Sequence, residues 1–132
     1  MDCSFVNNHA DGYGGAVEWY GANGKVMDCS FKNNNARYGG AVDWWAANGF
    51  LSTCSFVNNH ADAGGAVCWD IGATNGFLSA CSFVNNHAND YGGAVYWYSD
   101  NDTLKDCSFV NNHADGYGGA VFWWGDNGKV VD

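Results

Sequence analysis

Two motifs recur five times along this chain of 132 residues, and the repetition constrains the fold more than any other feature. Cys-Ser-Phe opens each copy and Gly-Gly-Ala-Val-x-Trp follows it, at a period of about 26 residues. We divide the chain into copies 1–27, 28–52, 53–79, 80–105 and 106–132 of a single domain. The recurring aromatic residues are Phe5, Phe31, Phe56, Phe83 and Phe109, and Trp19, Trp44, Trp69, Trp97 and Trp123.

Fixed apolar residues alternate with variable residues inside both motifs, which is typical of a strand with one buried face. In Val17-Glu18-Trp19, Val and Trp recur in every copy, whereas Asp, Cys, Tyr and Phe replace Glu18 in the others. Frequent Gly and Asn-Gly pairs disfavour helix. We predict three short strands per copy, at about 25–28, 29–33 and 40–45 in the coil that they share.

These strands predict an all-β fold, a right-handed single-stranded parallel β-helix (β-solenoid) of five coils. No copy can bury its own Phe and Trp, whereas coils stacked about 4.8 Å apart pair every strand with its neighbours. A β-sandwich is the alternative, but that fold does not need identical core residues at one fixed period.

Stacking predicts columns of identical side chains in the core, Phe on Phe and Trp on Trp. The first Asn of each Asn-Asn pair falls on the inward phase, and we expect its amide to hydrogen-bond along the stack. These residues are Asn7, Asn33, Asn58, Asn85 and Asn111. The Gly pairs predict a corner that needs positive φ or close backbone contact. Copies two and three are one residue shorter than the others between Phe and Gly-Gly.

Charge and composition exclude several classes of partner. Five Lys and Arg against 14 Asp and Glu leave a net charge of −9, which argues against binding nucleic acid or anionic lipid. No apolar run is long enough for membrane insertion, and Met1 to Phe5 do not look like a signal peptide. Aromatic residues make up 17% of the chain, which argues against disorder.

Two motifs, Phe-x-Asn-Asn and Gly-Gly-Ala-Val, carry a family resemblance. Phe5-Val6-Asn7-Asn8 with Gly14-Gly15-Ala16-Val17 resembles the repeats of chlamydial polymorphic outer-membrane proteins and of adhesin-like β-helix proteins of methanogenic gut archaea. Phe83 to Asn86 with Gly92 to Val95 matches in the same way, and the resemblance extends over all five copies. It implies a structural or adhesive protein, secreted to the cell surface or the extracellular space, that contacts surface glycans or host proteins.

Catalysis is the competing interpretation, because carbohydrate-active enzymes also use right-handed β-helices. A catalytic site requires a local break in symmetry, and this chain offers five near-equivalent coils with a single Arg, Arg37. We therefore predict no enzymatic activity, with a carbohydrate-binding or carbohydrate-active β-helix as the alternative function.

Five cysteines occupy one inward position, and their redox state stays open. Stacked neighbours would lie within the Cα range of a disulfide, although parallel Cβ directions suit that bond poorly. A reduced buried ladder, disulfides between coils and, less favoured, metal ligation are the alternatives for Cys3, Cys29, Cys54, Cys81 and Cys107. Cys68 lies on the outward phase and is expected to be an exposed thiol.

Four histidines share one corner position, which Asn35 occupies in the second copy; they are His9, His60, His87 and His113. A vertical row of imidazoles has a plausible ligand separation, but solvated corner side chains are the favoured interpretation. Asp11, Asp62, Asp90 and Asp115 could form a loose Ca²⁺ site, although no calcium-roll pattern is present. We predict no metal and no cofactor.

Outward aromatic residues beside the Trp motif form the surface that most suggests a partner. The candidates for lateral packing, or for stacking on sugars, are Tyr20, Trp45, Tyr98, Trp124, Tyr96 and Phe122, with Asp70 in the same row. The remaining alternative is that these side chains only cover the sheet and contact no partner. Asn101-Asp102-Thr103 is a glycosylation sequon in an expected turn, so Asn101 is a candidate for modification of a secreted protein.

Neither end of the repeat shows a capping segment. Met1-Asp2 repeats the phase of Met27-Asp28, and the last residues, Val131-Asp132, stop in that same phase. We expect uncapped coils, which either stack head to tail on a second chain or belong to a longer array.

Overall fold

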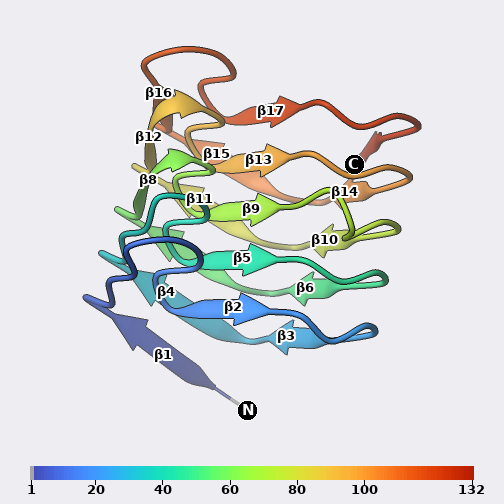
Figure 1. Cartoon of the computed structure of the whole chain (residues 1–132), viewed down its shortest axis with the longest axis horizontal. Helices are drawn as coiled ribbons and strands as arrows, with labels where there is room; N and C mark the ends of the chain where they lie inside the picture. The colour runs from blue at the N-terminus through green and yellow to red at the C-terminus, as the bar shows by residue number, and fades with distance from the viewer. Residues whose placement is uncertain (1) are drawn as a thin grey trace.

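Strands of successive coils lie directly above one another in the computed structural model, which describes residues 2–132 (Figure 1). Every strand pairing is parallel, and the partners are equivalent residues of neighbouring copies, such as Phe5 with Phe31 and Val17 with Val42. The described residues contain strands, turns and bridges but no helix. The predicted fold class, a parallel β-solenoid of five coils, is confirmed.

The three predicted strands of each coil build three sheets of five strands. The Phe sheet contains β1 (Cys3–Val6), β4 (Cys29–Lys32), β7 (Ser55–Val57), β11 (Ser82–Val84) and β15 (Ser108–Val110). The Trp sheet contains β2 (Val17–Trp19), β5 (Val42–Trp44), β9 (Val67–Trp69), β13 (Val95–Trp97) and β17 (Val121–Trp123). The Leu sheet contains β3 (Lys25–Met27), β6 (Phe50–Ser52), β10 (Phe77–Ser79), β14 (Thr103–Lys105) and β18 (Lys129–Val131).

A fourth, shorter sheet was not predicted. It contains β8 (His60–Ala63), β12 (His87–Tyr91) and β16 (His113–Ala114), and single bridges extend it to the first two coils. The alanine after each corner histidine points inward, and Ala61 and Ala88 are fully buried. Ala recurs at this position in all five copies, so the sequence does contain a polar residue followed by an inward apolar one. A pattern of only two residues is too short to predict a strand.

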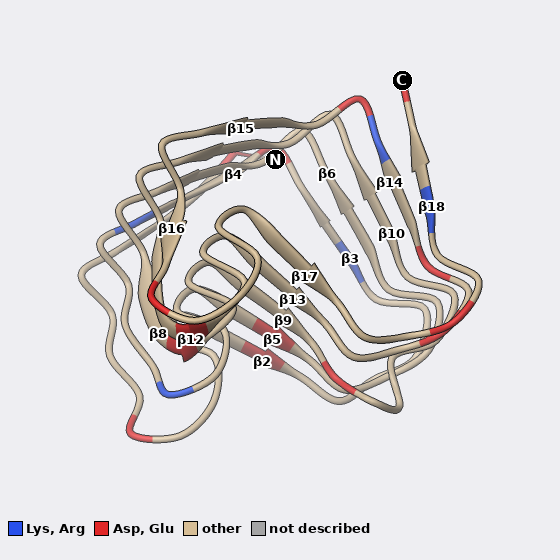
Figure 2. Ribbon diagram, turned by 90° about the horizontal axis from the view of Figure 1, so that it is seen from above, with Lys and Arg blue, Asp and Glu red and all other residues tan. Residues whose placement is uncertain are grey.

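The three long sheets enclose one interior, as the view along the stack shows (Figure 2). Buried residues from all three sheets pack there in a single hydrophobic core. Phe rings of adjacent coils have centroids 4.8 Å apart at Phe31–Phe56 and Phe56–Phe83, and are nearly parallel. The central Trp residues form an equivalent buried column, with 5.2 Å between Trp44 and Trp69. The predicted columns of identical aromatic side chains are therefore present, at the spacing of strands in a sheet.

The buried amide ladder uses the second Asn of each pair, so the sequence prediction chose the wrong residue. The first Asn has a positive φ, 55° at Asn58, and lies exposed at the corner. That left-handed conformation redirects the chain, and the following Asn59 turns inward. The ladder residues are Asn8, Asn34, Asn59, Asn86 and Asn112.

The Gly pairs have the two roles that were predicted for them. The first glycine adopts positive φ, 65° at Gly64, whereas the second lies against the backbone of the next coil, as Gly65 does against His87. Met1, which the sequence places in phase with Met27, lies outside the described residues. Residues 2–132 form no helix that is long and apolar enough to cross a membrane.

Candidate functional site

The outward side of the Trp sheet is covered by the corner loops that precede its strands. The Tyr13 ring packs edge-on against Trp45, at 5.3 Å between centroids, and Tyr91 packs against Phe122 at 5.0 Å. Side chains that point outward from the Trp sheet are therefore not all exposed to solvent. Tyr20 and Trp124 are 67% and 65% exposed, whereas Trp45, Tyr96, Tyr98 and Phe122 are half-buried.

The aromatic face, defined as Tyr20, Trp45, Tyr96, Tyr98, Phe122 and Trp124, is divided into two clusters. Tyr20 stacks on Trp45 at 5.9 Å, and at the other end Tyr96 stacks on Tyr98 at 5.9 Å. Asp70 and Cys68 lie between the clusters in sequence and register. The C-terminal cluster borders a hollow of about 260 Å³, whose lining residues are Tyr91, Tyr96, Tyr98, Phe122 and Trp124. Sequence reasoning missed the loop tyrosines, because their contact with the sheet depends on how the corner folds back.

Cys68 is buried, with 1% of its surface exposed, so the prediction of an exposed thiol is wrong. It lies beside Asp43 of the preceding coil and near Asp70, and the three potential ligand atoms are within 4.8 Å of one another. Neither carboxylate oxygen of Asp43 has a hydrogen-bond partner among the described residues. Burial raises the pKa of Asp43 to about 7, and burial also raises the pKa of the Cys68 thiol.

Asp43 is expected to make the protein less stable as the pH rises. Its folded pKa of about 7 exceeds the value of about 3.9 in an unfolded chain, so folding takes up a proton between these values. The contribution is complete below about pH 4 and is lost as the pH rises through 7, at a cost of about 4 kcal/mol. Urea denaturation of Asp43→Asn should show a higher stability than the unaltered protein at pH 8 and a smaller difference at pH 5.

The exposed Asp90→Asn variant is the matched control and should follow the unaltered protein at both pH values. Equal pH dependence in Asp43→Asn and the unaltered protein would show that the Asp43 carboxyl does not carry this effect.

The cysteine ladder stands in register, and all six cysteines of the chain are free thiols in the structure. Cys54 donates to the Ser52 carbonyl oxygen at 3.2 Å, and Cys81 donates to the Ser79 carbonyl at 3.2 Å. Each of these thiols has a carbonyl acceptor two residues earlier in the chain, in the preceding copy, and the redox state of the ladder stays a prediction.

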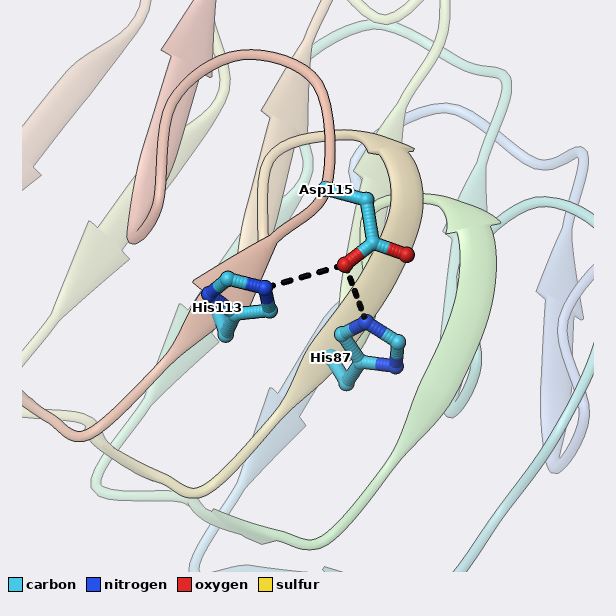
Figure 3. Close-up of side chains that lie close together, drawn as sticks. All are labelled: His87, His113 and Asp115. Atoms are coloured by element: carbon cyan, nitrogen blue, oxygen red, sulfur yellow. Dashed lines mark hydrogen bonds and ion pairs between the residues drawn. The ribbon is translucent and has the colours of Figure 1, made fainter.

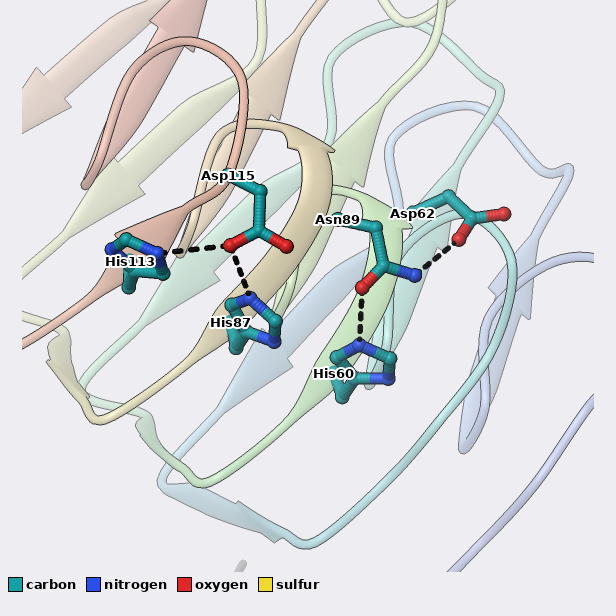
Figure 4. Close-up of polar contacts among 6 residues, drawn as sticks. All are labelled: His60, Asp62, His87, Asn89, His113 and Asp115. Carbon is teal, nitrogen blue, oxygen red and sulfur yellow. Dashed lines mark hydrogen bonds and ion pairs between the residues drawn. The ribbon is translucent and has the colours of Figure 1, made fainter.

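The histidine column, defined as His60, His87 and His113, brings three imidazoles to one corner of the stack (Figure 4). Ring centroids are 5.0 Å apart for His60–His87 and 5.4 Å for His87–His113. His9 lies outside this column of stacked rings and donates to Asp11 at 3.1 Å.

Asp115 contacts the C-terminal end of the histidine column, at His87 and His113 (Figure 3). Its Oδ1 accepts from His87 Nε2 at 3.3 Å and from His113 Nε2 at 2.9 Å. These two hydrogen bonds lower the pKa of the Asp115 carboxyl, which is therefore ionised at neutral pH. The loose Ca²⁺ site that was the less favoured alternative is not assembled, because within residues 2–132 no three of Asp11, Asp62, Asp90 and Asp115 come together.

Asn101 lies exposed in its turn, with φ of 61°, so the sequon is accessible. The neighbouring Asp102 is fully buried and accepts from Ser99 Oγ and from the Gly76 backbone N–H. Glycosylation of Asn101 stays a prediction.

Three segments match the family model of the Chlamydia polymorphic membrane protein (Chlamydia_PMP) repeat, namely residues 2–18, 80–96 and 106–122. Each segment runs from the start of the Phe strand across the corner to the Trp strand, in the first, fourth and fifth coils. These are the coils with the longer corner between Phe and Gly-Gly. The match fits a β-solenoid repeat of the polymorphic membrane protein type. No curated protein and no solved structure matches the chain significantly.

Proposed function

We propose that this chain is a surface, adhesin-like β-solenoid whose end coils stack head to tail on further copies of the chain, and that it acts by display and binding rather than by catalysis. The match to the Chlamydia polymorphic membrane protein repeat supports the surface role. The observation that carries the stacking is that the end coils present the same surfaces that neighbouring coils bury against one another.

The apolar core reaches the surface at both ends of the stack. At the first coil a hollow of about 340 Å³ is lined by core residues that include Phe5, Trp19 and Val26. At the fifth coil Val130 is 73% exposed, whereas its equivalents Leu51 and Leu78 are fully buried. A further coil of the same repeat at each end would bury these two surfaces.

The asparagine ladder gives the stack a direction. Each ladder residue donates its backbone N–H and its Nδ2–H to Oδ1 of the following coil, as Asn59 does to Asn86 at 3.0 Å. A coil that followed the fifth would receive the donors of Asn112, and a coil that preceded the first would donate to Asn8. The two ends are complementary, and repeated head-to-tail contact between them builds a filament.

Electron microscopy and light scattering of the purified chain test this proposal. The unaltered protein should form filaments whose length increases with concentration, whereas Gly119→Ala should stay monomeric. A Cβ at Gly119 is 3.7 Å from its nearest neighbour within the chain, so the fold tolerates it. The same Cβ would point at the backbone of a following coil, as that of Gly93 points at His113.

Gly12→Ala is the control, because a Cβ there meets nothing within 4 Å, and it should form filaments like the unaltered protein. Monomers of the unaltered protein at millimolar concentration would contradict stacking. Antibody labelling of intact producing cells tests the surface location independently, and signal only after permeabilisation would contradict it.

Carbohydrate binding at the aromatic face is the second candidate function. The hollow beside Tyr98 and Trp124 favours it, because exposed aromatic rings around a shallow depression provide faces on which sugars stack. Oligosaccharides that bind there would change the fluorescence of Trp124.

A further inference from the structure

The C-terminal end of the histidine column holds three metal-ligating side chains in a preorganised arrangement. His87 and His113 are partners in parallel strands β12 and β16, so the sheet sets the separation of their rings. Asp115 is placed by its own backbone, whose N–H donates to the Ala88 carbonyl oxygen at 3.1 Å. The backbones of all three residues are therefore held by hydrogen bonds between coils. Figure 3 shows the two imidazole rings pointing toward the Asp115 carboxylate.

The donor atoms have nearly the separations that one metal ion requires. The three residues each offer a ligand atom within 4.8 Å of the other two. Asp115 Oδ1 lies 3.3 Å from His87 Nε2 and 2.9 Å from His113 Nε2. Ligand atoms at about 2.0–2.2 Å from a tetrahedral Zn²⁺ lie about 3.3–3.6 Å apart. Small side-chain rotations would open room for an ion among them.

We propose that His87, His113 and Asp115 bind one divalent transition-metal ion, Zn²⁺ or a metal with the same ligand preference. Two imidazole nitrogens with one carboxylate oxygen suit Zn²⁺, Co²⁺ and Ni²⁺, whereas Ca²⁺ and Mg²⁺ prefer oxygen ligands alone. The ring proton of each histidine resides on Nδ1 when Nε2 is the ligand. The net charge of −9 favours a cation at this corner.

Access and coordination number agree with this assignment. The exposed fractions of the side chains are 38% for His87, 68% for His113 and 57% for Asp115. An ion can reach the site from solvent, and water can complete a fourth position. The site thus joins the fourth and fifth coils from outside the core.

The histidine column forms this ligand set once, because a site needs two stacked histidines and a carboxylate two positions after the second of them. In the fourth coil the residue at that position is Asn89, which accepts from His60 Nε2 at 3.0 Å and donates to Asp62 at 2.7 Å (Figure 4). A neutral amide is a much poorer ligand for Zn²⁺ than a carboxylate. In the second coil the corner itself carries Asn35 in place of histidine.

Zinc titration of the untagged chain by calorimetry, with Co²⁺ absorption as the spectroscopic probe, tests the proposal. We expect one Zn²⁺ per chain and visible Co²⁺ bands without a thiolate charge-transfer band, since no cysteine takes part. His113→Asn and Asp115→Asn should each weaken binding at least about tenfold. Both variants place at the site a residue that another coil already carries there, Asn35 or Asn89, so both should fold.

His9→Asn is the matched control, because His9 lies outside the cluster, and it should bind like the unaltered protein. Zn²⁺ should also raise the Tm of the unaltered protein and of His9→Asn but not that of His113→Asn. Equal affinity in His113→Asn and the unaltered protein would overturn the proposal. A Co²⁺ thiolate band, or no binding at all, would overturn it as well.

Discussion

Gly65→Ala is expected to prevent folding of the stack. Its new Cβ would overlap the carbonyl oxygen of Gly93 and lie 2.6 Å from that of His87, both in the backbone of the following coil. Backbone atoms at this spacing cannot move apart without breaking the hydrogen bonds on both sides, such as Gly65 N–H to Gly92 O at 3.0 Å. The loss should exceed about 4 kcal/mol, the range in which a small domain unfolds.

Circular dichroism and urea denaturation measure this effect, and the chain supplies a matched control. Gly119 occupies the same position of the motif in the last coil, where the nearest atom to a Cβ is 3.7 Å away. Gly119→Ala should therefore keep the stability of the unaltered monomer. Similar stabilities for the Gly65 and Gly119 variants would mean that coils do not approach as closely as the structure has them.

Asn59→Ala is expected to cost about 3–5 kcal/mol, because it leaves several buried groups without partners. The Asn59 amide donates to the Phe31 carbonyl oxygen and to Asn86 Oδ1, each at 3.0 Å. Its own Oδ1 accepts from the backbone N–H of Asn34 at 2.9 Å and from the Asn34 amide at 3.0 Å. The mutation thus breaks the ladder in the middle and uncouples the coils on either side.

Asn58→Gly is the contrasting variant in the neighbouring position. Asn58 is exposed and has φ of 55°, a conformation that glycine adopts without steric strain. The free energy of unfolding of Asn58→Gly should therefore differ from that of the unaltered protein by less than about 1 kcal/mol. Equilibrium urea denaturation of the two variants separates their roles. A larger loss in Asn58→Gly than in Asn59→Ala would restore the prediction made from the sequence.

The corners account for most of what sequence reasoning misplaced. Along a straight strand, side chains alternate between inward and outward, so a period of two in the sequence identifies both sets. This alternation is interrupted where the backbone enters the left-handed region. Asn58 shifts the phase by one residue there, and Asn59 rather than Asn58 faces the core. Cys68 lies outside the core cluster, on the outward side of its strand, yet it is buried there beside Asp43 and Asp70.

The sequence by itself determined the repeat, the parallel stacking and the columns of Phe and Trp, because identical residues at one period can be buried together only in register. The tertiary structure alone decided which asparagine forms the ladder, that Asp43 and Cys68 lose contact with water, and that His87, His113 and Asp115 meet. These outcomes depend on the path of each corner and on contacts between residues about 26 positions apart. Local patterns describe neighbours along a strand, whereas the sites arise between coils.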